Sequence, residues 1–185
     1  ITDPPYGIDF KSNGQLFTGA KSIYGDKTTE LAEIVAKFYS GKTVMMFFSP
    51  YKPYNINWRN VLVWNKGGHV GIGGDRETCW KRDFELIGVK DNRPLNGFRD
   101  SAVLNFNAVL PPPSGHFAEK PVGLMAYLIR KLTNPGDTII DPFMGSGSTI
   151  VAAIQEGRNA IGIERDADYF AIAQQRCLEA TYQPS

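Results

Sequence analysis

The chain is poor in the residues that build metal sites and disulfide frameworks. It holds two cysteines and two histidines among 185 residues, namely Cys79, Cys177, His69 and His116. The cysteines match no CxxC pattern and each histidine stands alone in the sequence, so we expect two reduced thiols and no metal site. These shortages argue against a disulfide-rich secreted scaffold and against a metal-binding module.

Long apolar runs and a large charge excess are absent as well. No segment approaches the roughly 20 apolar residues that a membrane helix needs, and no basic and then apolar signal segment opens the chain. We therefore expect a soluble, cytoplasmic protein that has no membrane partner. The formal net charge is +1, which argues mildly against extensive contact with nucleic-acid phosphates.

The residues that are present suffice for one globular domain. Of the 185 residues, 42% are hydrophobic and 21% are charged, so the chain has room for one substantial core, and we assign residues 1–185 to a single domain. An initiator methionine is missing, and Ile1 and Thr2 have the character of the last piece of a strand. We therefore expect residues upstream of this segment in the native protein, so that the domain is incomplete at its amino terminus.

Apolar periodicity divides the chain into strands and helices. Helices are predicted over residues 28–39 and 121–132, from the loop at 141–149 to residue 155, and over 167–180. Strands are predicted over residues 43–48, 61–64, 84–89, 102–106, 138–140 and 160–163. Strands that alternate with helices require crossover connections. The pattern therefore predicts an α/β fold with an open, mostly parallel sheet and helices on both faces.

The first seven residues, ITDPPYG, form a stiff acidic turn. Pro4 and Pro5 fix φ and remove backbone donors, so the carbonyls of this turn have no local amide partners and can face a ligand. A simpler interpretation is that Asp3 ends a strand, the prolines block pairing at a sheet edge, and Tyr6 packs on the core. The turn alone does not decide between the two.

A glycine loop, DPFMGSGST, lies at residues 141–149 between a predicted strand and a predicted helix. Gly145 and Gly147 lack Cβ, so a ligand can approach the main chain, and Ser148 or Thr149 can cap the helix that follows. Glu164 ends the next strand, 17 residues after Gly147, where doubly wound folds place an acid against ribose hydroxyls. The combination predicts an adenosine-containing ligand.

The details of this loop narrow the class of ligand. No lysine is present in it, which argues against a nucleoside triphosphate, and Ile150 stands where a dinucleotide fingerprint has its third glycine. Asp141 and Pro142 at the loop entrance suit a cationic or amine-bearing ligand such as S-adenosylmethionine. An ordinary strand-to-helix turn, with glycines for tight packing, is the alternative.

Together, the two motifs resemble those of the DNA amino-methyltransferases, the family that methylates exocyclic nitrogens of adenine or cytosine. Asp3-Pro4-Pro5-Tyr6 is similar to the catalytic tetrapeptide of that family. The stretches VLVWNKGG and FELIGVK are similar to strands between its two motifs, so the resemblance covers nearly the whole chain. It implies a Rossmann-like class I methyltransferase fold with S-adenosylmethionine as the methyl donor.

The resemblance also implies a donor site. The glycine loop is similar to the family's methionine-binding loop, Glu164 to its ribose acid, and HFAEKPVGL to the segment that flanks the donor. The residues expected at the donor are Asp141, Pro142, Phe143, Gly145, Gly147, Ser148, Thr149, Glu164 and Lys120.

The order of the motifs, with the tetrapeptide before the donor loop, corresponds to the circularly permuted β group of the family. In that group the segment before the donor helix, here about residues 91–115, occupies the target-recognition position. The partner is then double-stranded DNA, and a homodimer is possible because the family often forms dimers. The residues expected to contact DNA phosphates are Arg76, Arg82, Arg93 and Arg99.

In this family the opening turn has a chemical task. An adenine amino nitrogen donates its lone pair into the ring, so it is a poor nucleophile until acceptors hold its hydrogens. The Asp3 carboxylate and the Pro4 carbonyl can accept them, and Tyr6 can stack on a base flipped out of the duplex. We therefore expect methylation of adenine N6 in DNA, as in restriction-modification systems.

Two alternatives stay open on the sequence. Methylation of cytosine N4 would use the same acceptors, although the family's cytosine members more often carry serine in place of Asp3. A nucleic-acid-binding module without catalysis is the other alternative, suggested by the missing start and the modest positive charge. Asp3 argues moderately against methyltransferases of protein glutamine or RNA, in which asparagine begins a similar tetrapeptide.

Overall fold

The computed structural model describes residues 1–9, 25–67, 83–91, 93–110, 112, 114 and 118–181. The helices are α1 (Glu30–Phe38), α2 (Val122–Leu132), α3 (Ser148–Gln155) and α4 (Ala167–Thr181). The strands are β1 (Val44–Phe48), β2 (Asn60–Asn65), β3 (Phe84–Lys90), β4 (Val103–Asn105), β5 (Thr138–Asp141) and β6 (Asn159–Gly162). Each helix and strand predicted from the sequence is present, with ends that differ by at most a few residues.

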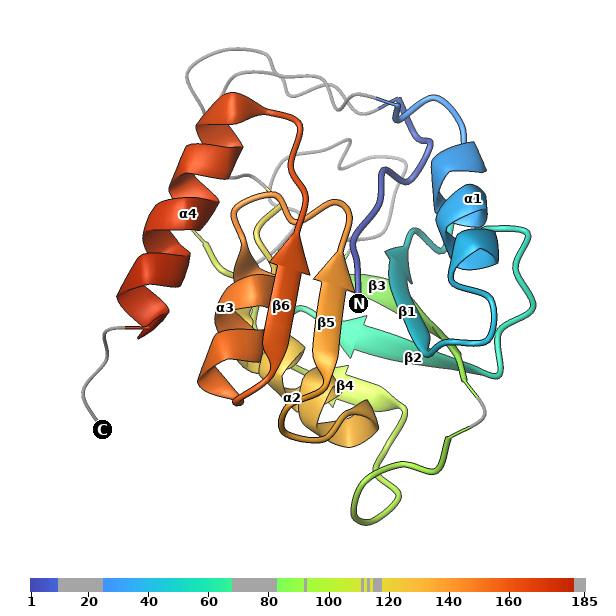
Figure 1. Ribbon diagram of the computed structural model, residues 1–185. Coiled ribbons are helices and arrows are strands. Elements are labelled where there is room, and N and C mark those ends of the chain that lie inside the picture. Colours follow the sequence, from blue (N-terminus) through green and yellow to red (C-terminus); the bar gives the residue numbers. More distant parts are fainter. Residues whose placement is uncertain are drawn as a thin grey trace.

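The first two residues join two groups of strands into one sheet. β1, β3, β2 and β4 pair in that order, and β5 pairs with β6. The Thr2 N–H donates to the Met45 carbonyl at 3.0 Å, the Phe47 N–H donates to the Thr2 carbonyl at 3.1 Å, and the Ile1 amino group donates to the Ile140 carbonyl at 3.3 Å. Figure 1 shows the amino terminus between β5 and β1. The strand order is therefore β6, β5, Ile1–Thr2, β1, β3, β2, β4.

Most strands of this sheet run in one direction. β5 pairs with β6 in parallel, Thr2 with β1 in parallel, and β2 with β4 in parallel, whereas β3 is antiparallel to both β1 and β2. The prediction of an open, mostly parallel sheet is confirmed. The reversal of β3 was not predicted, because strand direction depends on connections that apolar periodicity does not report.

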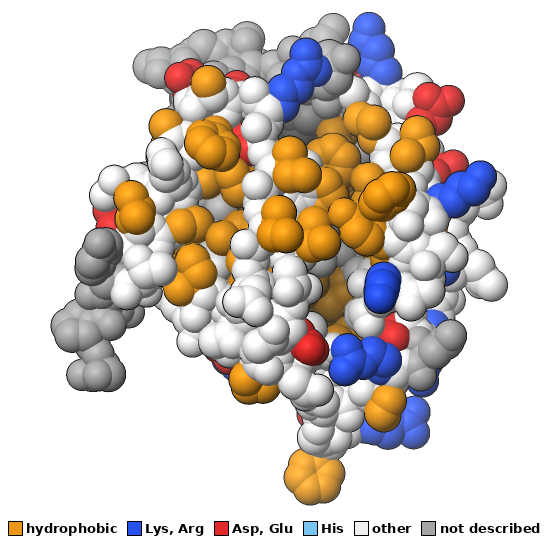
Figure 2. Space-filling model, viewed as in Figure 1, with side chains coloured by type: hydrophobic (Ala, Val, Ile, Leu, Met, Phe, Trp, Pro, Cys, Tyr) orange, Lys and Arg blue, Asp and Glu red, His pale blue; other side chains and the backbone are white. Residues whose placement is uncertain are grey.

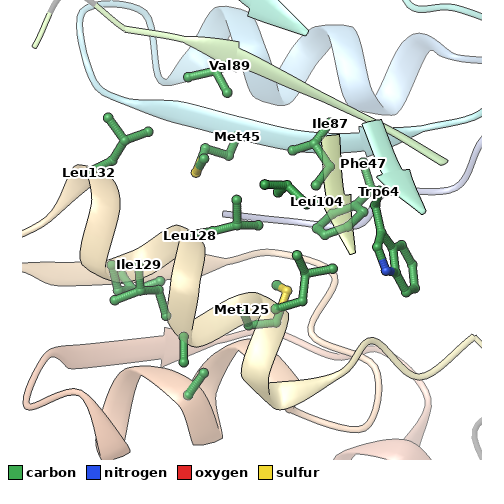
Figure 3. Close-up of a cluster of buried hydrophobic side chains, with 14 of the residues drawn as sticks. Met45, Phe47, Trp64, Ile87, Val89, Leu104, Met125, Leu128, Ile129 and Leu132 are labelled. Atoms are coloured by element: carbon green, nitrogen blue, oxygen red, sulfur yellow. The ribbon is translucent and has the colours of Figure 1, made fainter. Parts of the chain in front are cut away.

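Helices cover both faces of the sheet at β1, whose five residues are all buried. Met45 and Phe47 belong to a hydrophobic cluster with α2 and α3, whereas Val44, Met46 and Phe48 belong to a second cluster with α1. This alternation follows from the two-residue period of a strand. Figure 3 shows the first cluster, in which side chains of β1, β2, β3 and β4 face α2. The labelled members are Met45, Phe47, Trp64, Ile87, Val89, Leu104, Met125, Leu128, Ile129 and Leu132.

One face of the sheet is less completely covered at β5 and β6. Ile161 and Ile163 are about half exposed there, and Ile140 lines a groove between β5 and α1 together with Val35 and Tyr39. Figure 2 shows hydrophobic side chains gathered around this hollow. Within the described ranges, no helix is long and apolar enough to cross a membrane, and no group of three His, Cys, Asp or Glu residues could hold a metal ion.

Candidate active site

The acidic turn begins directly after Thr2, where the chain leaves the sheet. Its far end, at Gly7, is held by residues that pack against it. Buried Asp26 accepts the Gly7 N–H at 2.6 Å through its side chain. Gly7 has φ of +73°, and a Cβ placed on it would lie 2.9 Å from the Thr28 carbonyl carbon. Only glycine fits this crossing without strain. The turn that contains Asp3 is therefore fixed at both ends.

Asp3 lies in a cluster of five charged or phenolic side chains. Its Oδ1 accepts from the Tyr6 hydroxyl at 2.7 Å, and its Oδ2 accepts from Lys120 Nζ at 2.5 Å. Glu85 Oε2 lies 2.8 Å from the same Tyr6 hydroxyl and 3.3 Å from the same Lys120 Nζ. Lys66 Nζ binds the other Glu85 oxygen at 2.5 Å. The cluster thus joins the turn, the end of β2, β3 and the segment before α2.

Burial and charge shift these groups in different directions. Burial raises the pKa of Asp3 more than the Lys120 cation lowers it, and Glu85 adds to the rise. For Glu85, burial also raises the pKa, but the cations of Lys120 and Lys66 outweigh it and bring the pKa to about 2. Burial lowers the pKa of Lys120, while Asp3 and Glu85 more than compensate and leave it raised. Glu85 and Lys120 are therefore charged at neutral pH, and Asp3 is the carboxylate that protonates first.

Aromatic rings surround the Lys120 ammonium. Its Nζ lies 5.2 Å from the ring centroid of Phe47, 5.7 Å from that of Tyr6 and 5.8 Å from that of Trp64. These separations are within the range of cation–π attraction. The structure thus pairs Lys120 with Asp3 inside an aromatic cage, and its expected contact with the donor remains a prediction.

The second expected acceptor, the Pro4 carbonyl, faces Tyr54. The Tyr54 hydroxyl lies 3.5 Å from the Pro4 oxygen and 3.4 Å from the Pro5 oxygen. Both distances are long for a hydrogen bond from a hydroxyl group. Among the described residues, the Pro4 carbonyl is therefore only weakly engaged.

Buried Asp141 ties the acidic turn to the glycine loop. Its Oδ1 accepts from the Thr2 hydroxyl at 2.6 Å and from the Phe143 N–H at 3.1 Å, and its Oδ2 accepts from the Thr149 hydroxyl at 2.6 Å. Pro142 and the first half of the glycine loop therefore lie beside Thr2, the residue directly before Asp3. The two sequence motifs, 138 positions apart at Asp3 and Asp141, meet at one edge of the sheet.

The glycine loop turns back through two left-handed residues. Gly145 has φ of +52° and Gly147 has φ of +85°. The Gly145 N–H donates to Glu164 Oε2 at 2.9 Å, and the Arg176 guanidinium donates to the Ser146 carbonyl at 2.7 Å. Glu164 and α4 thus hold the loop in an open turn after β5.

Two polar groups at this loop retain bonding capacity. A carboxylate has about four acceptor sites, and Glu164 uses three of them for the N–H groups of Gly145, Arg165 and Asp166. The hydroxyl oxygen of Ser148, at the start of α3, is buried and has no partner within the described part of the chain. Each of the two groups can therefore form one further hydrogen bond, and their contact with a ligand stays a prediction.

Of the arginines expected at DNA phosphates, the two that the structure describes, Arg93 and Arg99, lie away from this site. Arg93 Nη1 lies 3.7 Å from Asp137 Oδ2, just before β5 begins and so at the opposite end of the strands from Asp3. Arg99 lies in the connector that packs on the carboxyl end of α2, where the Asn96 side chain donates to the Thr133 carbonyl at 2.8 Å. Arg76 and Arg82 lie outside the described residues, as does His116.

The segment expected to recognise the target is described only in part. Its residues 93–101 lie at the foot of the molecule in Figure 1, against the end of α2. Lys131 Nζ donates to the Phe98 carbonyl at 2.7 Å and pairs with Asp100 at 2.7 Å. This part of the segment is therefore packed against α2, away from Asp3, and its role in recognition stays a prediction.

Sequence reasoning missed Glu85, Lys66 and Tyr54 as members of the site. Glu85 and Lys66 entered only as members of the stretches FELIGVK and VLVWNKGG. One signal was available, because Glu85 is a single acid inside the otherwise apolar strand FELIGV, and acids seldom occupy buried strand positions without a partner. The partner itself could not be read from the sequence.

The known proteins that this chain is similar to are methyltransferases. Residues 63–175 match the DNA methylase family of N6 and N4 methyltransferases. M1.MboII, a type II methyltransferase of Moraxella bovis, is 44% identical to this chain over 164 residues, covering 85% of this chain and 61% of M1.MboII. The chain thus spans less than two thirds of the length of that relative.

Solved structures share the fold. The crystal structure of M1.HpyAVI in complex with S-adenosylmethionine is 25% identical, with a TM-score of 0.64, and the match covers 95% of this chain and 85% of M1.HpyAVI. The PvuII DNA methyltransferase, which is specific for cytosine N4, has a TM-score of 0.70 at 16% identity, and the match covers 95% of this chain and 77% of that one. The Rossmann-like class I fold predicted from the sequence is confirmed.

Proposed function

Because the chain belongs to the DNA methylase family of N6 and N4 methyltransferases, we propose that it methylates the exocyclic N6 of an adenine flipped out of double-stranded DNA. The observation that carries this proposal is the junction of the two motifs. The Thr2 hydroxyl, directly before Asp3, binds Asp141 at the entrance of the glycine loop at 2.6 Å. An acceptor for the substrate amine and a loop for the methyl donor therefore open at the same edge of the sheet.

The residues of the loop fit S-adenosylmethionine as the donor. Glu164 has an acceptor site left for a ribose hydroxyl, and the unpartnered Ser148 hydroxyl and the glycine backbone provide polar contacts without a Cβ in the way. When bound, S-adenosylmethionine supplies an electrophilic methyl group on a sulfonium sulfur. We assign its binding to Phe143, Gly145, Gly147, Ser148 and Glu164.

The chain itself acts on the amine. Asp3 would accept one N–H of the adenine amino group, which shifts electron density toward nitrogen as the new carbon–nitrogen bond forms and the methyl–sulfur bond of the donor breaks, its electron pair staying on sulfur. The nitrogen then loses one proton, which the Asp3 carboxylate can accept. Pro4 and Pro5 keep the acceptors in place, so little energy is lost to reorganisation.

Adenine is favoured over cytosine by the identity of Asp3 alone. The amine of cytosine N4 would meet the same acceptors, and the family includes both activities. Mass spectrometry of nucleosides from treated duplex DNA separates the two outcomes. N6-methyladenine would support the proposal, and N4-methylcytosine in its place would assign the chain to the other substrate.

Replacement of Asp3 tests the proposal directly. Asp3→Ala should lower the rate of methyl incorporation into DNA on the order of 10²- to 10⁴-fold, as expected when a group that handles a proton is removed, with binding of S-adenosylmethionine retained. Glu156→Gln, which alters a surface pair with Arg130, is the control and should keep full activity. Equal activity of Asp3→Ala and the unaltered chain would overturn the proposal, and absence of donor binding to either would favour a non-catalytic module.

A further inference from the structure

Both oxygens of the Asp3 carboxylate already carry a donor from the chain itself. The Tyr6 hydroxyl lies at 2.7 Å from Oδ1 and Lys120 Nζ lies at 2.5 Å from Oδ2. Under the proposed function, a substrate amine must approach the same oxygens. Each oxygen keeps about one acceptor site. A carboxylate that also accepts from Tyr6 and from the Lys120 ammonium has less negative charge to offer the amine, so Tyr6 and Lys120 compete with the substrate for Asp3.

Release of Lys120 from Asp3 is costly unless another carboxylate is at hand. The Lys120 side chain is only 8% exposed, and the rings of Tyr6, Phe47 and Trp64 surround its ammonium. A buried cation that loses its counter-ion in such surroundings is strongly destabilised. The site therefore needs a second anion close to Lys120.

Glu85 is placed to be that anion. Its Oε2 lies 3.3 Å from Lys120 Nζ and 2.8 Å from the Tyr6 hydroxyl. A phenol has one proton to donate, so Tyr6 can donate to Asp3 or to Glu85 but not fully to both. Small rotations of Tyr6 and Lys120 would thus transfer both donors from Asp3 to Glu85.

Glu85 is itself held in place independently of Asp3. Lys66 Nζ binds its Oε1 at 2.5 Å, and in the sheet register Glu85 lies opposite Trp64 of β2. Its strand, β3, is bonded on both sides, to β1 and to β2. Glu85 therefore stays fixed while the two donors move.

We propose that Glu85 is a positioning residue for methyl transfer, a second acceptor that takes Lys120 and Tyr6 from Asp3 when the substrate amine arrives. The inference rests on the proposed role of Asp3. It assigns Glu85 no contact with the substrate or the donor. Its task is to keep Lys120 compensated and to leave Asp3 free to accept the amine.

Charge balance in the cluster gives this proposal a specific signature. The two carboxylates, Asp3 and Glu85, face two ammonium groups, Lys120 and Lys66. Glu85→Gln leaves one cation in excess and commits Lys120 to Asp3. Lys120→Gln leaves one anion in excess and favours a protonated Asp3. The double variant Glu85→Gln/Lys120→Gln restores the balance and removes the competitor, so it should be more active than either single variant.

The test measures steady-state methyl transfer to duplex DNA at saturating S-adenosylmethionine. Glu85→Gln should lower kcat/KM for DNA on the order of 10- to 100-fold, the range that misplacement of a reacting group produces, while its affinity for the donor stays within about twofold. The double variant should recover at least about threefold over each single variant. Glu156→Gln is again the matched surface control. A double variant no better than the worse single one, or full activity of Glu85→Gln, would overturn the proposal.

The pH profile separates this role from simple support of the fold. Around Asp3 the titratable and charged groups are Tyr6, Tyr54, Glu85 and Lys120, with Lys66 behind Glu85. Because the Glu85 charge raises the pKa of Asp3 and the Lys120 charge lowers it, the acidic limb of kcat/KM should move to lower pH in Glu85→Gln and to higher pH in Lys120→Gln. An unmoved limb in both would overturn the proposal. The role of Asp3 is judged separately, because an active Asp3→Ala variant contradicts the proposed function whatever Glu85 does.

Discussion

The carboxyl group of Asp3 is partly buried beside Tyr6 and Glu85, and its surroundings raise its pKa even though Lys120 lies 2.5 Å away. The form that accepts an amine N–H is the carboxylate, so activity is lost as pH falls through this pKa. Because the pKa is raised, the loss should begin above the pH at which an ordinary aspartate, with a pKa of about 3.9, protonates. Measurement of kcat/KM across the range in which the fold is intact checks this. An acidic limb at or below the ordinary value would contradict it.

Asp141, which is 1% exposed, is another acid whose neighbours matter individually. The hydroxyls of Thr2 and Thr149 each donate to it at 2.6 Å. Thr149→Val keeps the shape of the side chain but leaves a buried acceptor without a partner, which should lower the free energy of unfolding by about 1 to 3 kcal/mol. Thr2→Val should act similarly and also loosen the turn that carries Asp3.

Chemical denaturation measures both of these changes. Thr181→Val is a suitable control, because Thr181 is exposed at the end of α4 and its hydroxyl donates to the Leu178 carbonyl three residues earlier in the same helix. It should change the free energy of unfolding by less than about 0.5 kcal/mol. If Thr149→Val lowers the free energy of unfolding no more than Thr181→Val does, then the hydrogen bonds of Asp141 do not hold the two motifs together.

The glycine loop approaches α4 closely at Gly147. A Cβ on Gly147 would lie 3.0 Å from the Ala173 Cβ and 3.2 Å from its Cα. Gly136 has nearly the same left-handed conformation, with φ of +83° against +85°, but open space beside it. Gly147→Ala should therefore lower the free energy of unfolding more than Gly136→Ala does. At Gly136 the only expected loss is the conformational strain of about 1 to 2 kcal/mol.

The difference between these two variants isolates the contact with α4. It should be at least about 1 kcal/mol in the free energy of unfolding, the usual cost of overpacking, and Gly147→Ala should also weaken binding of S-adenosylmethionine. Equal costs at the two positions would mean that α4 shifts freely to admit a methyl group. Glu164, which follows β6 and whose carboxylate accepts the Gly145 N–H, would then be the main support of the loop.

Helices and strands were predictable because the apolar residues that they bury recur at the regular spacing of a helix or a strand. β1 is an unbroken apolar run since both its faces are covered, and α2 shows its inward residues at helical spacing. Bonds between distant segments could not be predicted in the same way. Nothing local indicates that Lys120 meets Asp3 or that Glu85 stands between Tyr6 and Lys66. These contacts depend on which strands become neighbours, and the reversed β3 brings Glu85 to the site.

At the level of the whole chain, the site lies where the two groups of strands join. Ile1 and Thr2 connect β5 to β1, and the residues directly after them form the acidic turn. The meeting of the two motifs was predictable from the switch-point rule for doubly wound sheets, which places ligands at the carboxyl ends of adjacent strands. The location of Arg93 and Arg99 was not predictable, because exposed charges on connectors leave no pattern in the sequence.

The charge distribution of the molecule yields a final prediction, on DNA binding. The net charge is +1. In the cluster around Asp3, the carboxylates of Asp3 and Glu85 balance the ammonium groups of Lys66 and Lys120. Arg93, beside Asp137, and Arg99 both lie near the carboxyl end of α2, whereas Lys120 precedes its amino end. An 11-residue helix such as α2 is about 16 Å long at 1.5 Å per residue. Contact of either arginine with the DNA segment around a base bound at Asp3 is therefore disfavoured.

Salt dependence of DNA affinity tests this placement against the expectation from the sequence. A side chain that neutralises one phosphate contributes about 0.9 to the slope of log K against log salt concentration. Arg93→Ala and Arg99→Ala should each leave the slope within about 0.3 of that of the unaltered chain, a change well below one phosphate contact. A slope reduced by nearly 1 in either variant would place that arginine on the DNA. The duplex would then have to extend along α2 to the foot of the molecule, which would support a recognition role for residues 93–101.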